Sequence, residues 1–321
     1  MDNVNTVRVG CGTEYLTETK GLGMLGKTVI LMQSGILPGL GGLIEDLRNH
    51  SVEALVSAFD EGDEAALRNA CSGFLTENAE GETLCITDSE NAYRILRRQG
   101  MYVLPCRHDR NRGADFKGAF YVIEQVEEIG FAEVDMAYRR LAGLPWEILT
   151  TKRCIVRETT VEDVDSFYEI YAEPDITKYM ENLYADREEE IAYIEEYRDK
   201  VYAFYGYGMW TVLTKEGTVI GRAGIGWREG FDVPELGFVI GALWQRQGYA
   251  FEVCGAILAY AREELGITQM CALVMEGNGK SASLCRKLGF REQGSVLLEG
   301  RRHSVFRMQH FTPTEALSAL K

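Results

Sequence analysis

Hydrophobic and polar positions follow two different patterns along the chain. Between residues 26 and 143, short apolar runs alternate with segments in which apolar residues recur at helical spacing. The runs predict strands at 28–32, 84–87 and 102–105, and the spaced segments predict helices at 43–49, 92–99, 122–129 and 134–141. Strands that alternate with helices in this way predict a parallel α/β layer.

The second half of the chain contains a strand, a turn and a helix in immediate succession. The apolar run 236–240 predicts the strand, and apolar residues from Val253 to Ala261 recur at helical spacing. Between them lies the turn Gln245-x-x-Gly248-x-Ala250. The first N–H groups of a helix lack intrahelical partners and its dipole is positive there, so the turn predicts a pyrophosphate site. Glycine also serves packing at such junctions, and the turn alone does not separate the two roles.

A boundary between two domains is predicted near residue 145. Pro145 ends the helix predicted before it, and an apolar strand follows within about ten residues. Residues 1–25 are rich in glycine and threonine without a clear period, which is typical of an arm or an edge hairpin. We therefore expect an arm at 1–25, a first domain at 26–145 and a second at 146–321, since 321 residues suffice for two cores.

Charge and composition limit the partners. The formal net charge of −15 disfavours nucleic acid, whose phosphates would be repelled, and fits cationic amines better, although acidic residues also serve solubility. There is no apolar run of about eighteen residues and no signal-peptide pattern, so we expect a cytoplasmic protein without a membrane span. The eight cysteines include no C-x-x-C pair, so no metal site is predicted and the thiols are expected in a reduced core.

Further motifs stand in order around the turn, namely Cys154-Ile-Val-Arg-Glu158, Glu173-Pro-Asp-Ile-Thr-Lys-Tyr-Met180, Glu235-Leu-Gly-Phe-Val-Ile-Gly241 and Asn278-x-x-Ser281-x-x-Leu284. Together they closely resemble the GNAT family of acyl-CoA-dependent N-acetyltransferases, and more narrowly its RimJ/RimL-like branch, over roughly residues 150–310. The resemblance implies a mixed-sheet α+β domain that transfers an acetyl group from acetyl-CoA to a primary amine by direct attack in a ternary complex. The acceptor would be a protein N-terminus or a small amine.

The resemblance also assigns the cofactor-binding residues. In this family the strand before the turn pairs with the pantetheine arm, which corresponds here to Phe238, Val239 and Ile240. The pyrophosphate would lie on the turn formed by Gln245, Arg246, Gln247, Gly248, Tyr249 and Ala250, with Arg246 free to add a charged contact. Asn278 would contact the cofactor at the start of the following helix.

Transfer requires a proton acceptor for the amine and a proton donor for the leaving thiolate. Glu235 opens the cofactor-binding strand, where many family members place a water-organising carboxylate, and a solvated strand-end glutamate is an alternative of equal weight. Glu299 is the second candidate base. Many relatives use a tyrosine as the acid at the position of Cys285, so Ser281 is the expected substitute if an acid is used at all. Alternatively, Ser281 only satisfies the helix start and Cys285 only packs.

The acceptor pocket is expected from residues 174–186, 188–202 and 205–210, a region dominated by aromatic side chains. Aromatic rings can form a wall that binds a cation, and acidic neighbours would add attraction. The same residues fall near helical spacing, which is typical of core. We expect core for most of them and select Tyr207 and Trp210 as pocket residues.

The first domain resembles, more weakly, a degenerate haloacid-dehalogenase-like or other Rossmann-like core, through Leu84-Cys-Ile-Thr-Asp-Ser89 and Phe120-Tyr-Val-Ile-Glu124. That family needs an Asp-x-Asp pair after its first strand, where this chain has Gln33-Ser34, so no phosphatase chemistry is predicted. Asp88 could bind a ligand at the sheet edge, and the turn 39–42 could accept an anion. An ordinary N-cap and an ordinary tight turn explain the same residues.

The whole sequence therefore predicts a two-domain α/β protein, a non-catalytic Rossmann-like unit followed by an N-acetyltransferase. Its expected partners are acetyl-CoA and an amine, with no nucleic acid and no membrane, and a homodimer is compatible with it. The alternative from another class is a non-catalytic acyl-CoA-binding sensor. Both the missing tyrosine and the missing nucleophile favour that alternative.

Overall fold

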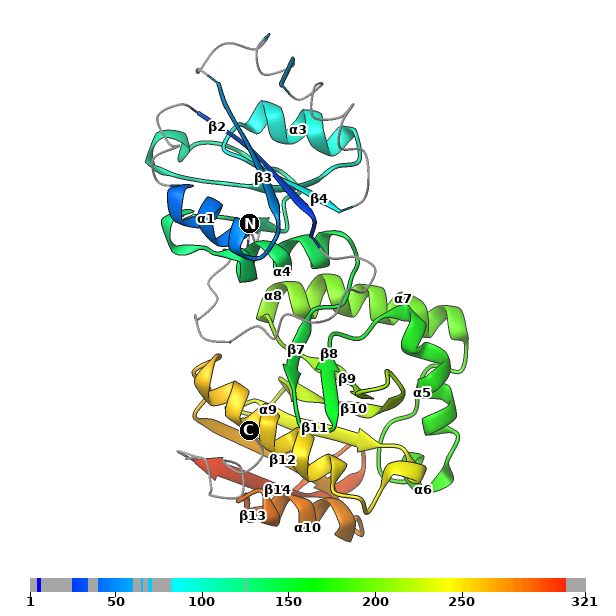
Figure 1. Ribbon diagram of the computed structural model, residues 1–321. Coiled ribbons are helices and arrows are strands. Elements are labelled where there is room, and N and C mark those ends of the chain that lie inside the picture. Colours follow the sequence, from blue (N-terminus) through cyan, green and yellow to red (C-terminus); the bar gives the residue numbers. More distant parts are fainter. Residues whose placement is uncertain are drawn as a thin grey trace. The chain divides into compact units, whose positions relative to one another are not determined.

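The computed structural model describes residues 5–6, 25–33, 40–59, 65, 69–70, 82–124 and 126–309. The chain forms two compact units, Met1–Trp146 and Glu147–Lys321 (Figure 1). Within the described ranges, no helix has both the length and the apolar character needed to cross a bilayer.

The N-terminal unit is built on a four-stranded sheet whose strands are all parallel, in the order β3-β2-β4-β5. The strands are β2 (Lys27–Gln33), β3 (Glu53–Phe59), β4 (Thr83–Thr87) and β5 (Tyr102–Pro105). Helices α1 (Gly41–Asn49), α3 (Glu90–Arg98) and α4 (Phe131–Leu141) and the 3-10 turn η2 (Asp109–Asn111) lie between and after them. β2 and β4 are buried on both faces, as their apolar runs require, and the predicted parallel α/β layer is confirmed.

The helix predicted at 122–129 is wrong. Here the chain forms the short strand β6 (Tyr121–Val122), which pairs in parallel with β1 (Asn5–Thr6), followed by the 3-10 turn η3 (Val126–Glu128). The next residue, Ile123, bridges to Cys106. Partners far along the chain hold these β-branched residues extended and override the local helical spacing. Of the predicted arm 1–25, only residues 5–6 and 25 belong to the described residues. Residue 39 of the turn 39–42 also lies outside them.

The C-terminal unit contains an eight-stranded mixed sheet in the order β13-β14-β12-β11-β10-β9-β8-β7. Neighbouring strands are antiparallel except β11 and β12, which are parallel. The strands are β7 (Glu147–Thr150), β8 (Cys154–Arg157), β9 (Met209–Thr214), β10 (Val219–Gly226), β11 (Glu235–Ile240), β12 (Gln269–Met275), β13 (Arg291–Leu298) and β14 (Arg301–Gln309). The helices are η4 (Val161–Asp163), α5 (Val164–Tyr171), α6 (Pro174–Thr177), α7 (Arg187–Tyr197), the π-helical turn η5 (Arg198–Tyr202), α8 (Ala203–Tyr205), η6 (Ala242–Trp244), α9 (Tyr249–Glu263) and α10 (Gly279–Lys287).

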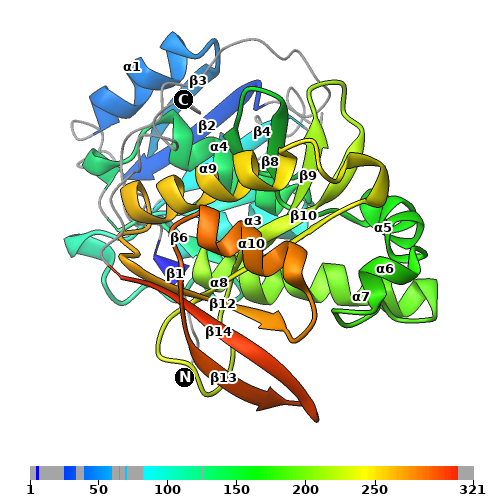
Figure 2. The same cartoon turned by 90° about the horizontal axis from the view of Figure 1, so that it is seen from below.

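Helices cover both faces of this sheet, and Figure 2 shows α9 and α10 together over one of them. On that face Trp210 of β9 is fully buried and meets the ring of Tyr260 edge-on at 5.9 Å. On the opposite face, α5 packs on β10, and the guanidinium of Arg222 lies 4.8 Å from the centre of the Phe167 ring. The mixed-sheet α+β architecture predicted for this half is confirmed.

Candidate active site

The parallel strands β11 and β12 separate soon after they meet. β11 pairs with β10 along its whole length, from Gly226 opposite Glu235 to Gly221 opposite Ile240. With β12 it pairs at one register position, Glu235 opposite Cys271. Beyond that position, the β12-facing backbone groups of 236–240 have no ladder partner among the described residues. An extended ligand with amide groups of its own can pair with them.

The turn after β11 ends in a helix N-terminus that no side chain caps. Gly248 is the N-cap of α9, with φ of 86°, and Arg246 also has a positive φ of 64°. Glycine adopts this backbone conformation at no steric cost, which explains the small residue found by the sequence pattern. The helix has 15 residues, so its free N–H groups and positive dipole end form a site for an anion.

Two glutamine side chains brace this turn from within. The amide nitrogen of Gln245 donates to the carbonyl oxygen of Ile240 at 2.9 Å, and its amide oxygen accepts from Lys280 Nζ at 3.3 Å. Gln247 donates to the carbonyl of Leu243 at 2.8 Å. These amides are therefore occupied in shaping the turn. An anion there would meet the backbone and the exposed Arg246.

Helix α10 begins beside the opening between β11 and β12. Asn278 is its N-cap, and the side-chain oxygen accepts the backbone N–H of Ser281 at 3.1 Å. Among the described residues, the Ser281 hydroxyl has no hydrogen-bond partner, which leaves it able to donate to a ligand. Cys285 is completely buried, and burial raises the pKa of its thiol to about 12. It packs in the core, the alternative that the sequence left open for it.

The two candidate bases share one cationic neighbour. Oε2 of Glu235 accepts from Nε of Arg228 at 2.8 Å, and the Glu235 side chain is 17% exposed. Burial lowers the pKa of Arg228, but the hydrogen bond and charge of Glu235, together with the charges of Glu181 and Glu299, outweigh it and raise that pKa. Glu299 has φ of 48° in the turn between β13 and β14. One carboxylate, that of Glu235, therefore contacts this guanidinium, and Glu181 and Glu299 act on it through their charges.

An aromatic pair lies near the start of β9 and the end of β10. The indole N–H of Trp227 donates to the hydroxyl of Tyr207 at 2.6 Å, and Trp227 is 50% exposed. Tyr207 therefore stays our candidate for the acceptor pocket. Trp210, in contrast, is a core residue with no exposed surface. Sequence reasoning missed Trp227 and Arg228, although an aromatic and a basic residue directly after a glycine-rich strand are a usable signal.

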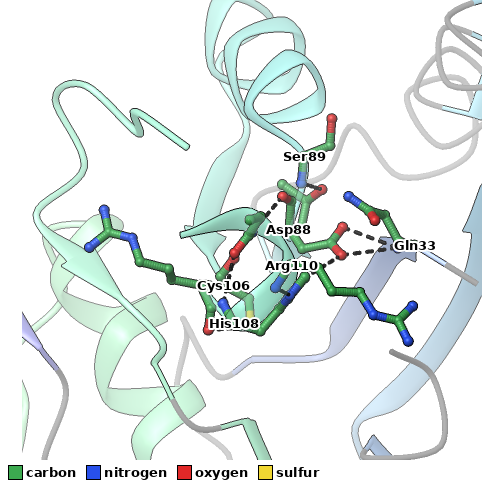
Figure 3. A network of polar contacts seen from close by, with 9 residues as sticks. Gln33, Asp88, Ser89, Cys106, His108 and Arg110 are labelled. Atoms are coloured by element: carbon green, nitrogen blue, oxygen red, sulfur yellow. Dashed lines mark hydrogen bonds and ion pairs between the residues drawn. The ribbon is translucent and has the colours of Figure 1, made fainter. Parts of the chain in front are cut away.

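A second polar cluster lies at the carboxyl edge of the N-terminal sheet (Figure 3). The carboxylate of Asp88 accepts the backbone N–H of Gln33, at 3.1 and 3.2 Å from its two oxygens. Nδ1 of His108 accepts the N–H of Arg110 at 3.1 Å, so the ring proton is on Nε2, which donates to Asp88 at 2.9 Å. Ser89 caps α3 by accepting from Ala92. The N-cap interpretation of this segment therefore holds.

Burial raises the pKa of Asp88, although its hydrogen bonds with His108 and Gln33 act in the opposite direction. Both oxygens already accept hydrogen bonds from the protein, and the side chain is buried. This geometry stabilises the edge of the sheet by joining the ends of β2 and β4 to the segment after β5.

Comparison with known proteins gives consistent results for the C-terminal unit. Residues 153–291 match the family model described as the acetyltransferase (GNAT) domain. The chain is 27% identical over 147 residues to the uncharacterised N-acetyltransferase YnaD of Bacillus subtilis, covering 46% of this chain and 84% of that protein. It is 29% identical over 165 residues to the [ribosomal protein uS5]-alanine N-acetyltransferase of Escherichia coli, covering 48% and 82%.

Among solved structures, the acetyltransferase (GNAT family) from Bacillus anthracis aligns with a TM-score of 0.44 and 19% identity, over 50% of this chain and 98% of that one. The assignment of the C-terminal unit to the acetyltransferase (GNAT) domain depends on the family model and the two sequence relatives, and this structural alignment adds nothing to it.

Proposed function

From the premise that residues 153–291 form a GNAT acetyltransferase domain, we propose that the protein transfers an acetyl group from acetyl-CoA to a primary amine. The observation that carries the proposal is the separation of β11 from β12 directly beside the uncapped N-terminus of α9. One feature offers unpaired backbone to an amide-containing arm, and the other offers free N–H groups to a pyrophosphate. Acyl-CoA carries both groups.

The donor would use the residues that the sequence selected. Within the segment Phe238, Val239 and Ile240, the backbone groups that face away from β10 would bond the pantetheine amides, apart from the Ile240 carbonyl, which already accepts from Gln245. The pyrophosphate would lie on the N–H groups at Gly248 and after it, with Arg246 contributing charge. The Ser281 hydroxyl at the start of α10, which has no hydrogen-bond partner in the described part of the chain, supports a hydrogen bond to the cofactor sulfur, and Asn278 would fix the start of that helix.

The reaction is direct. The nitrogen lone pair of a neutral amine attacks the thioester carbonyl carbon, the carbon–sulfur bond breaks, and the products are the N-acetyl amine and the free thiol of CoA. The amine must lose a proton, and Glu235 or Glu299 would accept it, directly or through water. The Arg228 guanidinium supports the assignment to Glu235 because its hydrogen bond to Oε2 holds that carboxylate in a fixed position.

The departing thiolate must gain a proton. Cys285 cannot supply it from a fully buried side chain. Ser281 would stabilise the developing thiolate by donating a hydrogen bond to the sulfur, and the thiolate would then take its proton from water.

The acceptor is proposed to be a primary amine, either a protein N-terminus or a small molecule. The charges of Glu181, Glu235 and Glu299, which all act on Arg228, support a cationic acceptor, since they would attract an ammonium group before the amine is deprotonated. The name of the Escherichia coli relative supports a protein N-terminus as the first acceptor class to examine. Tyr207 and Trp227 would form an aromatic wall of the pocket.

Two substitutions that remove one functional group each test the proposal. Glu235→Gln should lower kcat at least about tenfold if Glu235 accepts the amine proton, and Ser281→Ala should do the same if Ser281 stabilises the leaving thiolate. Neither substitution should change the affinity for acetyl-CoA much. Arg262→Met, on the far end of α9, is the matched control and should retain full rate. A wild-type protein that binds acetyl-CoA but transfers no acetyl group to any amine would instead identify a non-catalytic acyl-CoA sensor.

For the N-terminal unit we propose a Rossmann-like fold and a non-catalytic role. The parallel order β3-β2-β4-β5 supports a Rossmann-like topology, and the complete internal hydrogen bonding of Asp88 supports the absence of catalysis there. Turnover of residues 147–321 alone should equal that of the full chain if the first unit does not gate the reaction.

A further inference from the structure

The turn between β7 and β8 contacts the first turn of α9 through an ion pair between the partly exposed Arg153 and the buried Glu252. Nε of Arg153 donates to Oε2 of Glu252 at 2.6 Å, and the backbone N–H of Arg153 donates to Oε1 at 2.9 Å. The hydroxyl of Thr151 donates to the same Oε1 at 2.8 Å. Glu252 is 4% exposed, and both of its oxygens are occupied.

A carboxylate at this place needs a cation beside it. Burial raises the pKa of Glu252, but the hydrogen bonds from Thr151 and Arg153 outweigh burial and hold it below its ordinary value, so the group is ionised. An ionised glutamate in the first turn of a helix stabilises the helix dipole, but it would also repel a phosphate bound at the same end. Arg153 neutralises that charge, so the helix end stays available to an anion.

Arg153 also holds the turn that precedes α9. Its Nη1 donates to the carbonyl oxygen of Gln247 at 2.9 Å, and its guanidinium carbon lies 4.2 Å from the centre of the Tyr249 ring. Nη2 would lie 3.4 Å from a Cβ added at Gly248. One side chain thus contacts, or closely approaches, three consecutive residues of the proposed pyrophosphate site.

The contact with Gln247 fixes the direction of the next N–H group. In a trans peptide the carbonyl and the following N–H point in opposite directions across a plane. Because the Gln247 carbonyl is turned toward Arg153, the N–H of Gly248 is turned away from it. Gly248 has φ of 86°, a backbone that could otherwise rotate with little penalty.

We propose that Arg153, held by Glu252, is a positioning residue that orients the Gln247–Gly248 peptide and thereby sets the affinity of this site for the pyrophosphate of the acyl donor. The inference rests on the proposed function and deepens it, since it assigns donor selectivity to a residue outside the turn. Arg153 acts through the backbone and takes no part in the chemical step. Its loss should therefore affect donors that carry a pyrophosphate and spare donors that end before it.

The test compares two donors, acetyl-CoA and S-acetyl-pantetheine, which has the thioester and the pantetheine arm without the pyrophosphate. With the full chain, Arg153→Met should raise KM for acetyl-CoA about tenfold, the effect of one misplaced hydrogen bond to a charged group, with kcat unchanged. KM for S-acetyl-pantetheine should stay within about twofold, because that donor never meets the turn. Arg262→Met removes an ion pair with the adjacent Glu263 at the other end of α9, away from the turn, and should change neither constant.

Several outcomes overturn the inference. An equal rise in KM for both donors would mean that Arg153 only stabilises the unit. No rise for either donor would mean that the Gln247–Gly248 peptide keeps its orientation without Arg153. If Arg153→Met does not fold, Arg153→Lys keeps the charge but cannot reach Glu252 and Gln247 together, and the same donor-selective loss is expected. A wild-type protein that uses or binds neither donor would instead refute the proposed function.

Discussion

Gly224 of β10 has no room for a side chain. A Cβ atom added there would lie 2.0 Å from the carbonyl oxygen of Gly208 and 2.7 Å from Cα of Met209. Both are backbone atoms, and the same Gly208 oxygen accepts the N–H of Ile225 at 3.0 Å. Substitution by alanine would therefore force β10 away from the segment that leads into β9. This change should destabilise the transferase unit.

The expected magnitude follows from three contributions. Overpacking of this kind costs about 1–3 kcal/mol, and weakening the Ile225 hydrogen bond adds about 1 kcal/mol. Replacing a strand glycine by alanine returns about 0.5–1 kcal/mol of backbone entropy, because Gly224 does not use a positive φ. The net loss in the free energy of unfolding is about 1–3.5 kcal/mol. For a unit of this size, that corresponds to a fall in Tm of roughly 2–14 °C.

Gly226, two residues further along the same strand, provides the matched control. A Cβ added at Gly226 would meet no atom within 4 Å, so Gly226→Ala should leave Tm unchanged or raise it slightly. Unfolding can be followed by tryptophan fluorescence, to which the fully buried Trp210 contributes. If Gly224→Ala unfolds at the wild-type temperature, or if both alanines cost the same, the steric reasoning is refuted.

Three further predictions test other parts of the molecule. Burial raises the pKa of Cys285 to about 12, so the folded protein should resist iodoacetamide at this thiol at pH 8, and Cys285→Ala should keep the wild-type kcat; rapid labelling or a lost rate would contradict its place in the core. Asp163→Ala should cost about 3–5 kcal/mol in urea unfolding, because it leaves the half-buried Arg157 without the buried carboxylate that binds both of its terminal nitrogens at 2.7 Å; a cost below about 1 kcal/mol would refute this. Burial also raises the pKa of Asp88 above 3.8, so the protonated side chain is the form that the folded state favours. The free energy of unfolding of the N-terminal unit, relative to that of Asp88→Asn, should therefore be greatest below pH 3.8 and fall as the pH rises through the raised pKa. A wild-type advantage that grows with pH would contradict this.

Features set by neighbouring residues could be predicted from the sequence. The turn from Gln245 to Ala250 was identified because a positive φ, a helix start and an apolar strand occur within about fifteen residues and each has its own residue preference. The buried strands β2 and β4 were recognised for the same local reason, since continuous apolar runs mark strands covered on both faces.

Features set by distant residues could not be predicted. The pairing of Arg153 with Glu252 joins positions 99 apart, and the sequence of neither segment indicates that the two residues meet. The contact of Arg228 with Glu235, and the effect of the Glu181 and Glu299 charges on that arginine, likewise depend on how strands and loops meet in the folded unit. The error at 122–129 has the same origin, because strand partners elsewhere in the chain decided that segment.

The central claim is acetyl transfer to an amine, and one measurement tests it most directly. The purified full chain is incubated with acetyl-CoA labelled in the acetyl group and a bacterial extract, and mass spectrometry locates the label after separation by size. The account predicts label on amine nitrogen, in proteins or in small molecules, with one free thiol released for each acetyl group transferred. Binding of acetyl-CoA with no labelled amine and no thiol release above the buffer rate would contradict it.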